Sequence, residues 1–597
     1  MDSIKGVAAT GGLLFGTLAA VFERLEHTSS RKQLISLLAD LLRQVEPEAI
    51  AQVTYLLQGR VAPLYEPVEF GLGERSIERA VAEAYGVDPS QVRQHYARVG
   101  DLGLVVTELA RDSTDGADRS VLDVFAELGR VADISGAGSG ERKLAALRGL
   151  LAGLDPISAK HLVRIPLGNN RLGVGDATIL AAFNEARLGG AKAEQVSLEE
   201  AYNRTSDLGL LGRTLWTAGL EGVRKLQVTV GRPIRPQLAE RLPDVPSLLE
   251  KLGGRAHAQL KFDGIRVQLH LDRSQAEGHQ VRLFSRSLED MTAMFPELVQ
   301  GVVQQVQASS AILDSEALAF NPLSEEFLPF QETTRRRRKH GIGDLAAELP
   351  LKAMVFDVMY RDGQALLDRP LLARIDVLQA IVSGTDVLLP ERGVVVDRPE
   401  QLDALFESAL ERSLEGLVVK RVDSPYQAGA RNFNWVKLKR HSRGALEDTI
   451  DCVLLGYFVG RGKRVGLGVG ALLVGVYDAR ADEFKTVTKI GTGLSDDQWR
   501  EVAERAAPYR SEQRPARVQS RIVPSVWLEP KIVVEVLADE ITSSPNHTAG
   551  YALRFPRVIR FREADKRPED ATTLAELVEL YHAQRGRAPG SEAELSA

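Results

Sequence analysis

The sequence is poor in cysteine, has no long apolar run and carries no excess of positive charge. Its one cysteine among 597 residues, Cys452, excludes a disulfide framework and a cysteine-rich zinc module, and suits a reducing compartment. The net charge of −6 gives no basic signal for the whole chain, so any nucleic-acid surface must be local. Hydrophobic residues at 44% and charged residues at 26% are typical of a soluble globular protein of about two to four domains.

No membrane or secretion signal is visible. The apolar stretch 11–22 is too short to span a bilayer, and Glu23 and Arg24 follow it at once. It is better interpreted as a buried amphipathic helix. We therefore expect a cytoplasmic protein, associated with the nucleoid if its source is prokaryotic, and no membrane partner.

The common glycine loops that bind phosphates are absent as well. No Gly-x-x-x-x-Gly-Lys-Ser/Thr segment occurs, which excludes a P-loop. Residues 466–471 fit a loose dinucleotide-binding pattern, but residues 472–477 after them are typical of a strand and not of a helix. A turn between two barrel strands is the better interpretation, so nucleotide binding must depend on other residues.

Residues from about 15 to 225 have the periodicity of helices throughout. Helices are predicted at 34–42, where Ser30 can cap the start, at 78–85, which Gly86 ends, at 141–151 and at 177–188. The proline-rich stretch 231–236, with the sequence Gly-Arg-Pro-Ile-Arg-Pro, then marks a domain boundary.

The remainder of the chain predicts two further domains. Residues 231–445 mix strands and helices, and beyond them short apolar runs alternate with glycine turns. These runs, at 453–456, 471–477 and 532–536, indicate a small β-barrel. We therefore expect a multidomain protein with an all-α domain at 1–230, an α+β domain at 231–445 and a β-barrel domain with a C-terminal tail at 446–597.

The most informative segment is 261–266, Lys-Phe-Asp-Gly-Ile-Arg. Apolar and polar residues alternate on both sides of it, which is the period of a strand. Asp-Gly between two such runs predicts a β-hairpin with one apolar and one polar face. The polar face carries Gln259, Lys261, Asp263 and Arg266. It fits either an exposed charged hairpin or a lysine nucleophile in a pocket that lowers its pKa.

The segment resembles the first motif, Lys-x-Asp-Gly-x-Arg, of the covalent nucleotidyltransferases, which include DNA ligases, RNA ligases and capping enzymes. Further motifs of this superfamily follow in order. They are Ser285-Arg286, Asp314-Ser315-Glu316, 354–358 (Met-Val-Phe-Asp-Val), 415–420 (Glu-Gly-Leu-Val-Val-Lys), 435–439 (Trp-Val-Lys-Leu-Lys) and 553–557 (Leu-Arg-Phe-Pro-Arg) with Asp565-Lys566 downstream. The last of them resembles the final motif of ATP-dependent DNA ligases, and the resemblance covers nearly the whole chain.

The resemblance implies a role for each matching residue. Lys261 would be the catalytic residue that carries AMP. By the same resemblance, Gln259 would recognise adenine and Phe356 would stack on it. Arg266 and Arg286 would contact ribose or phosphate, and Glu316 would contact the nucleotide. Phosphate contacts would come from Arg431, Lys437 and Lys439, and Arg554 and Lys566 would orient pyrophosphate.

The same resemblance places the carboxylates of Glu316 and Glu415 near a magnesium ion. Lysine at its ordinary pKa of ~10.4 is protonated at neutral pH and cannot attack phosphorus. A local cation helps to release that proton and neutralises the departing pyrophosphate. Mg²⁺ suits this role because few carboxylates hold it, together with phosphate oxygens and water.

Two positions depart from the family pattern. The residue two before the nucleophile is often glutamate, which accepts a hydrogen bond from the adenine amino group, whereas here it is Gln259. An amide accepts through its oxygen but also donates, so the expected preference for ATP over ADP or GTP is weaker. Ser315 stands where glycine is usual.

Segments outside these motifs indicate contacts with DNA. Residues 56–63 and 170–175 resemble parts of the helical DNA-binding domain of archaeal and eukaryotic ligases, and 231–236 resembles the linker that follows it. Such a domain grips the duplex backbone, which fixes position without reading sequence. The densest basic run, 335–340, fits a phosphate contact and a solvated loop equally well.

The resemblance therefore implies an ATP-dependent DNA ligase that acts in DNA replication, repair and recombination. It would seal nicks in duplex DNA through a lysyl-AMP intermediate and a 5′-adenylated DNA intermediate, with ATP and Mg²⁺. Its barrel would be an OB fold that swings away after the first step so that DNA can enter. The partner would be nicked double-stranded DNA, and we expect a monomer, with a sliding clamp as a further candidate partner.

Two alternatives stay open at this point. An RNA ligase or a capping-type guanylyltransferase would share the lysine and most central motifs, but it would not need the long helical region. A non-enzymatic DNA-binding or scaffold protein would have lost the nucleophile or the metal carboxylates, and Lys261, Glu316 and Glu415 are all present. An NAD-dependent DNA ligase is excluded, because its four-cysteine zinc site cannot form here.

Overall fold

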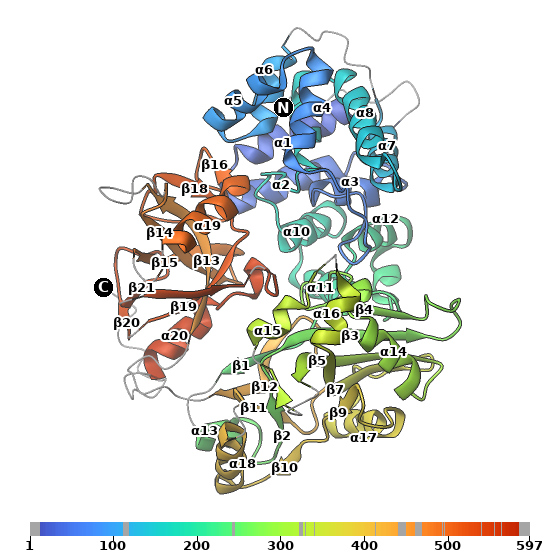
Figure 1. The fold of residues 1–597 in the computed structure, drawn as a ribbon, viewed down its shortest axis with the longest axis vertical. Helices are drawn as coiled ribbons and strands as arrows, with labels where there is room; N and C mark the ends of the chain where they lie inside the picture. The colour runs from blue at the N-terminus through green and yellow to red at the C-terminus, as the bar shows by residue number, and fades with distance from the viewer. Residues whose placement is uncertain are drawn as a thin grey trace. The chain divides into compact units, whose positions relative to one another are not determined.

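The structure is a computed structural model. It describes residues 12–583 apart from 112–118, 242–244, 322–325, 329, 339–340, 412–413, 440–448, 460–467, 492–493, 495, 539, 555 and 563. Its contacts divide the chain into two compact units (Figure 1). The first unit comprises Met1–Tyr202, Asp207–Lys225 and Thr449–Leu574, and the second comprises Asn203–Ser206, Leu226–Asp448 and Ala575–Ala597. Among the described residues, none of the helices combines the length and the apolar character needed to cross a bilayer.

The N-terminal part of the first unit is helical, as the sequence predicts. Its helices are α1 (Phe15–Glu26), α2 (Arg31–Leu42), α3 (Ile50–Leu57), α4 (Glu74–Tyr85), α5 (Pro89–Val99), α6 (Leu102–Leu109), α7 (Val121–Asp133), α8 (Ser139–Ala152), α9 (Pro156–Arg164), α10 (Asp176–Arg187), α11 (Lys192–Thr205) and α12 (Leu208–Arg224). The predicted helix at 11–22 corresponds to α1, which buries Phe15, Leu18 and Phe22.

The ends of these helices follow local chemistry. Gly86 ends α4 in a left-handed conformation with φ of 67°, which glycine adopts without steric cost. Asp155 starts α9 by accepting the backbone N–H groups of Ile157 and Ser158, with proline at the first helical position. Ser30 does precede α2, but its hydroxyl makes no capping hydrogen bond, so the predicted cap is wrong in its mechanism.

The C-terminal part of the first unit is a curled antiparallel sheet that forms a half-barrel, consistent with an OB fold. Its elements are β13 (Ile450–Phe458), β14 (Ala471–Asp478), β15 (Glu483–Ile490), α19 (Asp496–Ala506), β16 (Arg510–Ser511), β17 (Val518–Gln519), β18 (Val526–Leu528), β19 (Val533–Leu537), β20 (Glu540–Ser543), β21 (Tyr551–Arg554) and β22 (Arg557–Phe561). The order β16-β18-β13-β14-β15-β17 is extended by β19 and β22, while β20 and β21 form a separate hairpin. A strand and not a helix follows residue 470, as expected.

The second unit contains two sheets with helices around them. One sheet joins β1 (Leu238–Arg241), β12 (Arg431–Lys439), β11 (Gly416–Arg421), β2 (Ala256–Lys261) and β10 (Val394–Val396) in that order. The other contains β4 (Val281–Ser285), β3 (Ile265–Asp272), β5 (Ser310–Asn321), β7 (Leu351–Arg361) and β8 (Gln364–Ala365), with β6 (Glu326–Phe327) beside β5 and β9 (Leu388–Pro390) beside β7. We call these the β2 sheet and the β3 sheet.

Most helices of the second unit lie between these strands in the sequence, and one follows all of them. They are α13 (Val245–Lys251), α14 (Pro296–Gln305), α15 (Phe330–Arg335), α16 (Ile342–Glu348), α17 (Leu371–Ile381), α18 (Pro399–Glu411) and α20 (Leu574–Ala583), which begins at the last residue of the first unit. Short 3₁₀ helices occur at Thr292–Met294 in this unit, and at Ala507–Tyr509 and Pro568–Asp570 in the first.

The strands on either side of residues 262–264 do not form a hairpin, so this prediction is wrong. β2 pairs with β11 and β10, whereas β3 pairs with β4 and β5. The chain passes from one sheet to the other at Asp263 and Gly264. Asp-Gly favours a tight turn, but long-range pairing decides which strands become neighbours, and here each strand has better partners elsewhere.

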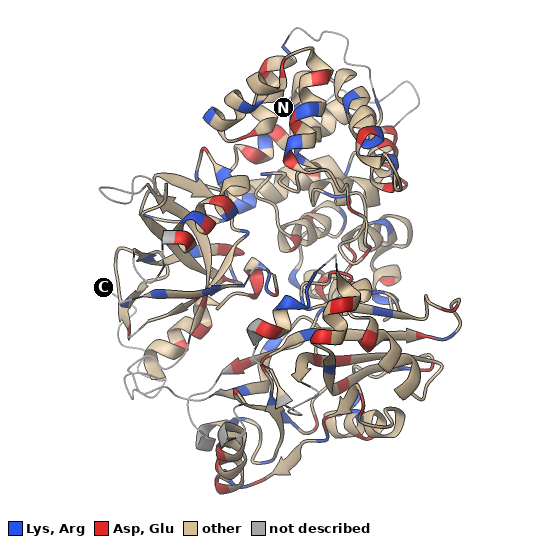
Figure 2. Cartoon of the chain, in the orientation of Figure 1, with Lys and Arg blue, Asp and Glu red and all other residues tan. Residues whose placement is uncertain are grey.

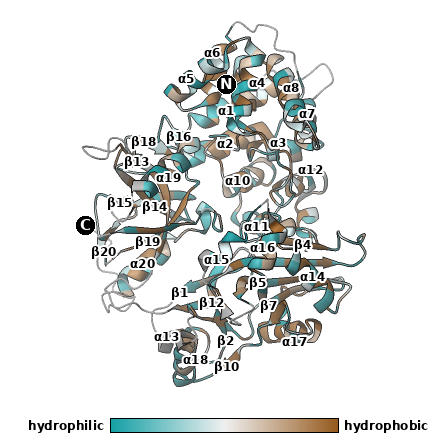
Figure 3. Cartoon of the chain, viewed as in Figure 1, coloured by the Kyte–Doolittle hydropathy of each residue, from teal (hydrophilic) through white to brown (hydrophobic). Residues whose placement is uncertain are grey.

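The predicted alternation of apolar and polar residues is nevertheless present in both strands. On β2, Ala256 and Ala258 join one apolar core, and on β3, Val267 and Leu269 join another that includes residues of β5 and β7. Figure 3 shows hydrophobic residues along β5 and β7. The opposite faces of β2 and β3 carry the polar residues, because side chains of a strand alternate between its faces.

The proline-rich stretch 231–236 is anchored within the second unit by side chains of β3. Gln268 accepts the N–H of Ile234 at 2.9 Å and donates to its carbonyl at 2.6 Å. His270 accepts the N–H of Gly231 through Nδ1 at 3.0 Å. Burial lowers the pKa of His270 to about 3, so it stays neutral and keeps this acceptor.

Candidate active site

The end of β2 brings a lysine and a glutamate together. The ε-amine of Lys261 forms an ion pair with Oε2 of Glu415. The backbone supports the pair, since the Glu415 N–H donates to the Lys261 carbonyl at 3.2 Å. Both side chains are partly accessible, at 21% for Lys261 and 27% for Glu415. The amine is therefore held in a fixed place that a solvent-borne molecule can reach.

A second carboxylate lies close to the same amine. Glu316 on β5 accepts the N–H of Gly264 at 3.1 Å. Burial raises the pKa of the Glu316 carboxyl to about 7, against the opposing effects of Lys261 and Arg266. A half-buried carboxylate whose negative charge is this poorly compensated has capacity for a further cation.

Gly264 allows the close approach of β3 to β5 at this point. A Cβ on residue 264 would lie 2.3 Å from the carbonyl oxygen of Ala317, a distance that no side chain tolerates. Ser315, which replaces the usual glycine, fits because its hydroxyl donates to the Val267 carbonyl at 2.7 Å. The departure at 315 therefore leaves the strand pairing intact.

Arg266 is fixed by the acidic residue of the third motif. Its Nε and Nη2 donate to the two oxygens of Asp314 at 3.0 and 2.7 Å, and Nη1 donates to the Gln237 carbonyl at 2.8 Å. The hydroxyl of Tyr426 also donates to Asp314, at 2.7 Å. A bidentate pair of this kind fixes the plane of the guanidinium, a constraint that the sequence alone does not reveal.

Gln259 lies on β2 two residues before Lys261 and is 2% exposed. Its Nε2 donates to the carbonyls of Phe356 and Glu391, at 3.2 and 3.0 Å. Because both neighbours are carbonyl oxygens, the amide nitrogen must face them and Oε1 points elsewhere. Within the described part of the chain, Oε1 has no hydrogen-bond partner.

Phe356 is half-buried at the middle of β7. Its ring meets Trp435 edge to face, with centroids 6.2 Å apart. Two cations lie near the ring, Arg266 with Cζ at 5.5 Å and Lys420 with Nζ at 4.8 Å from the centroid. The ring is thus positioned from several sides while part of its surface stays accessible.

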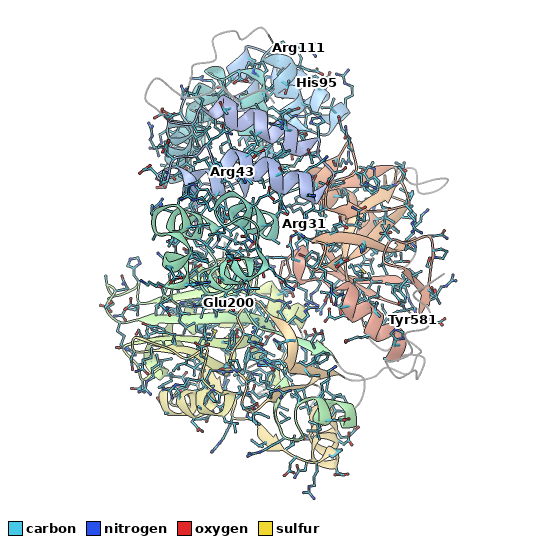
Figure 4. All side chains as sticks on the ribbon, turned by 180° about the vertical axis from the view of Figure 1, so that it is seen from behind. Arg31, Arg43, His95, Arg111, Glu200 and Tyr581 are labelled. Carbon is cyan, nitrogen blue, oxygen red and sulfur yellow. The ribbon has the colours of Figure 1, made fainter. Side chains whose placement is uncertain are left out.

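Arg431 and Lys437 on β12 share one acidic partner. Both form ion pairs with Glu576 on α20, and the Lys437 Nζ lies 3.5 Å from its Oε1. Tyr581, labelled in Figure 4, lies near the C-terminal end of α20. The side chain of Lys439 lies outside the described residues. Sequence reasoning did not find Glu576, because it follows Arg431 by 145 positions and belongs to no motif.

Three predicted site residues remain: Arg286, Arg554 and Lys566. Arg286 follows β4 in a turn. Arg554 ends β21 in the first unit and is exposed. Lys566, also in the first unit, pairs with Asp451 at the start of β13. Arg554 and Lys566 belong to the first unit, whereas Lys261 belongs to the second.

The two segments expected to contact DNA are neighbours in the helical part. Asn170 donates to the Leu56 carbonyl at 2.6 Å, and a Cβ on Gly59 would lie 3.1 Å from Asn170 Cγ. Figure 2 shows basic residues interspersed with acidic ones over the helices of the first unit. The juxtaposition favours one contact surface made from both loops.

Three arginines of the basic run at 335–340, namely Arg335, Arg336 and Arg337, form contacts within the protein itself. Arg336 is 1% exposed and donates to the Leu349 carbonyl at 3.0 Å and to Glu297 at 2.5 Å. Arg335 pairs with Glu332 at 2.6 Å, and Arg337 pairs with Glu289. Residues 339–340 lie outside the described residues. Both interpretations, a phosphate contact and a solvated loop, fail for Arg336, which is a buried structural arginine.

Comparison with known proteins agrees with the motifs. A model of the ATP dependent DNA ligase domain matches residues 236–439, one of the DNA ligase N terminus matches 14–184, and one of the ATP dependent DNA ligase C terminal region matches 466–566. A probable DNA ligase of Dictyoglomus turgidum is 43% identical over 580 residues, which cover 96% of this chain and 98% of that protein. This chain belongs to the ATP-dependent DNA ligase family.

Another relative of nearly the same length supports the same family. A DNA ligase of Hyperthermus butylicus is 38% identical over 608 residues, covering 97% of this chain and 99% of that protein. A solved mycobacterial DNA ligase D complexed with ATP and MES is 26% identical and covers 57% of this chain and 97% of that one, with a TM-score of 0.33. As a member of the family, the ligase is an ATP-dependent enzyme that seals nicks in DNA.

The family decides between the alternatives. An RNA ligase or a guanylyltransferase does not account for the match of residues 14–184 to the DNA ligase N terminus. A scaffold protein without activity does not account for the match of residues 236–439 to the ATP dependent DNA ligase domain or for the match to DNA ligases over nearly the whole chain. The ligase therefore combines the helical part and the two sheets in one DNA-sealing enzyme.

Proposed function

We propose that Lys261 is the nucleophile of the ligase and carries AMP. Its Nζ attacks the α-phosphorus of ATP, a P–N bond forms and the P–O bond to pyrophosphate breaks. The 5′-phosphate at a nick then takes the AMP and breaks the P–N bond. Finally, the 3′-hydroxyl attacks the adenylated phosphate, which seals the strand and releases AMP. The observation that carries this proposal is the partly accessible amine that pairs with Glu415 and whose charge also acts on the Glu316 carboxyl.

The carboxylates of Glu316 and Glu415 fit a magnesium ion. Both are oxygen donors, and burial leaves the charge of Glu316 poorly compensated. When bound, Mg²⁺ would neutralise charge that develops on phosphate oxygens. The chain's own contribution is to fix both carboxylates, Glu316 through the Gly264 N–H and Glu415 through the Lys261 amine.

Around the nucleophile we propose a nucleotide site made of the motif residues. Phe356 stacks on adenine and Gln259 accepts from its amino group. The remaining contacts to ribose, phosphate and pyrophosphate come from Arg266, Arg286, Glu316, Arg431, Lys437, Lys439, Arg554 and Lys566. The pairing of Arg266 with Asp314 supports this, because a guanidinium of fixed plane is preorganised for a hydroxyl or phosphate oxygen.

For the substrate we propose nicked duplex DNA gripped by residues 1–230, with 231–445 as the adenylation domain and 446–597 as the OB-fold domain and tail. The juxtaposition of the 56–63 and 170–175 loops supports the grip. We propose a monomer that acts in replication, repair and recombination, with a sliding clamp as a recruiting partner.

Labelling with ATP tests the nucleophile. The ligase is mixed with Mg²⁺ and ATP labelled at the α-phosphate, denatured, and examined for covalent label by mass spectrometry. Label is expected on Lys261 and is lost in Lys261→Ala. The matched control is Lys352→Ala, a half-buried lysine on β7 whose amine lies 4.1 Å from the Phe320 ring. An adduct that persists in Lys261→Ala, or no adduct at all, overturns the proposal.

A further inference from the structure

Asp482 lies in the turn between β14 and β15, and its carboxylate is buried against helices of the same unit. The turn belongs to the barrel part of the first unit, Thr449–Leu574, and Asp482 is 2% exposed. Its Oδ2 accepts the hydroxyl of Thr178 on α10 at 3.0 Å and lies 4.0 Å from Nε of Arg31 on α2. A carboxylate of the barrel part is thus enclosed by side chains of the helical part.

The two helices that reach this carboxylate lie side by side and run in the same direction. Arg31 is the first residue of α2 and Thr178 is the third of α10, and both meet Asp482. At the other end, Nη2 of Arg43 donates to the Glu185 carbonyl at 3.0 Å. Arg31 and Arg43, labelled in Figure 4, mark the two ends of α2. Two helix N-termini therefore converge on one carboxylate, and the partial positive charge of each favours an anion there.

The donors at this place are not all satisfied by the carboxylate. Nε of Arg31 is buried and has no hydrogen-bond partner within the described part of the chain, because Asp482 at 4.0 Å is too distant to accept from it. The second oxygen of Asp482 is engaged in the barrel part, where it accepts from Tyr477 at 2.8 Å and from Arg517 at 2.5 Å. A phosphodiester has more than one non-bridging oxygen and would accept from both Arg31 and Thr178.

The neighbouring acidic residue does not supply this anion. Asp176 is the first residue of α10, but its two carboxylate oxygens accept from Nε2 of Gln58, at 3.0 Å, and from the hydroxyl of Tyr202. Arg567 of the barrel part lies 3.8 Å from the same carboxylate. The charge of Asp176 is therefore committed to other groups, and the anion that meets Arg31 comes from the barrel part.

The two segments proposed to contact DNA face the barrel part in the same unit. A cavity of about 120 Å³ separates them, lined by Gln58 and residues 169–174 on the helical side and by Arg517, Lys531 and Glu569 on the barrel side. At ~30 Å³ for each water molecule, this volume holds a few waters and not a duplex. DNA therefore reaches these segments only after the barrel part moves away from them.

We propose that Arg31 and Thr178 form a binding site for a backbone phosphate of DNA, which the carboxylate of Asp482 occupies while the barrel part covers the helices. The inference deepens the proposed function and rests on it, because it requires the helical part to grip the duplex. The phosphate takes the place of the carboxylate, so capture of DNA and release of the barrel part use the same two side chains. The contact fixes position on the duplex and reads no sequence.

Titrations of nicked duplex with the full-length ligase over a salt series test this site. Arg31→Gln should bind about tenfold more weakly, since it loses a hydrogen bond to a charged group, and its salt slope should fall by about one. Thr178→Val should bind about fivefold more weakly with an unchanged slope, because a hydroxyl carries no charge. Arg43→Gln, at the other end of α2, removes the same charge and should bind normally. AMP labelling should be normal in all three variants.

Removing the carboxylate should have the opposite effect. Asp482→Asn keeps one oxygen for Tyr477 and Arg517 but loses the charge that competes with phosphate, so it should bind about fivefold more tightly. In the Arg31→Gln background the same change should give little gain. Asp497→Asn, an exposed position on α19, is the control for the altered net charge. If Asp482→Asn fails to fold, the two helical variants decide the question alone.

Unchanged affinity in Arg31→Gln, or weaker binding by Asp482→Asn, would show that these residues only join the barrel part to the helices. A nicked duplex with photoreactive groups on its backbone tests the proposed DNA grip separately. Crosslinks within residues 1–230 together with normal binding by Arg31→Gln would refute this phosphate site alone. An absence of crosslinks in that range would refute the grip itself.

Discussion

The ε-amine of Lys261 is paired with the carboxylate of Glu415, a residue 154 positions later in the chain. A protonated amine is not a nucleophile. If Lys261 is the nucleophile that we propose, this pair describes its resting state, in which the amine is placed but still engaged by Glu415. Binding of ATP would then have to release the amine from Glu415 before it reacts.

This relationship predicts different defects for the two partners. Lys261→Ala should abolish sealing that starts from ATP but retain sealing of a nick that already carries a 5′-adenylate, because that substrate bypasses the nucleophile. Glu415→Ala and Glu316→Ala should impair both reactions, by about 2.7–4 kcal/mol in the barrier, if these carboxylates stabilise charge in every step. Single-turnover sealing of a synthetic adenylated nick measures the difference.

Lys352→Ala is the control for this series and should seal both substrates normally. If the two glutamate variants sealed the adenylated nick at the full rate, their carboxylates would only hold Lys261 and Gly264 in place. The assignment of Glu316 and Glu415 to a metal ion would then be wrong.

The shared partner of Arg431 and Lys437 leads to a second prediction. Glu576 holds both cations with a carboxylate that competes with a phosphate for them. Glu576→Gln should therefore lower the KM for ATP in self-adenylylation, by about fivefold if the competing pairs contribute ~1 kcal/mol. Glu579→Gln, one turn further along α20, is the matched control. An unchanged KM in Glu576→Gln would mean that neither cation contacts the nucleotide.

The helices and strands whose formation depends on neighbouring residues could be predicted from the sequence. The helices of the first unit follow from apolar spacing and from stops such as Gly86, and the strands β2 and β3 follow from alternation. Which strands become neighbours is decided by residues far apart in the chain. For this reason the Asp-Gly turn at 263–264 was misread as a hairpin, although the residues on the polar faces of both strands were identified correctly.

The site was predictable only as far as the motifs extend. Motifs name Lys261, Glu316 and Arg266, but they do not say that Asp314 fixes Arg266. The motif at 415–420 likewise does not say that the Lys420 amine is buried against the rings of Trp435 and Phe356. Strand alternation places it on the same face as Val418, and a lysine at an inward position of a buried strand was the available signal.

Close packing at the first motif gives a third prediction. Gly264→Ala would push a methyl group to within 2.3 Å of the Ala317 carbonyl oxygen, which forces β3 and β5 apart. We expect a loss of about 1–3 kcal/mol in stability and a strong reduction in AMP labelling, since Glu316 would lose the Gly264 N–H. Gly343→Ala in α16, where a Cβ has open space, should leave labelling unchanged. Normal labelling of Gly264→Ala would show that this approach is not required.

A fourth prediction concerns the helical part and DNA. A ligase shortened to residues 226–597 keeps the hydrogen bonds that anchor 231–236 through Gln268 and His270. It should still label itself with AMP but bind nicked duplex at least about tenfold more weakly and with a smaller salt dependence, because phosphate contacts are lost. Binding titrations over a salt series compare it with the full chain. An equal affinity and an equal salt slope would place the DNA grip outside residues 1–225.

The fifth prediction concerns a buried ion pair between α6 and α9. Asp101 starts α6 by accepting the Gly103 N–H at 2.7 Å, and it pairs with Arg164, which is 1% exposed. Burial alone would raise the pKa of Asp101, but Arg164 and Arg171 lower it to about 2. A carboxyl whose pKa is lower in the folded state adds stability above its unfolded pKa of about 4. That stability is lost as the pH falls through about 2.

Asp101→Asn should therefore destabilise the helical part at pH 7 and pH 5 by the same amount, about 3 kcal/mol, because Arg164 loses a buried partner. At pH 3 the difference from the unchanged ligase should shrink by about 1 kcal/mol, since the unfolded carboxyl is then largely protonated while the folded one is not. Urea unfolding of α6 and α9, followed by pulsed hydrogen exchange at a fixed labelling pH, measures this difference. The control is Asp133→Asn, at an exposed position at the end of α7, which should show no such trend. A difference that stays constant from pH 7 to pH 3 would mean that the charge on Asp101 does not stabilise the fold.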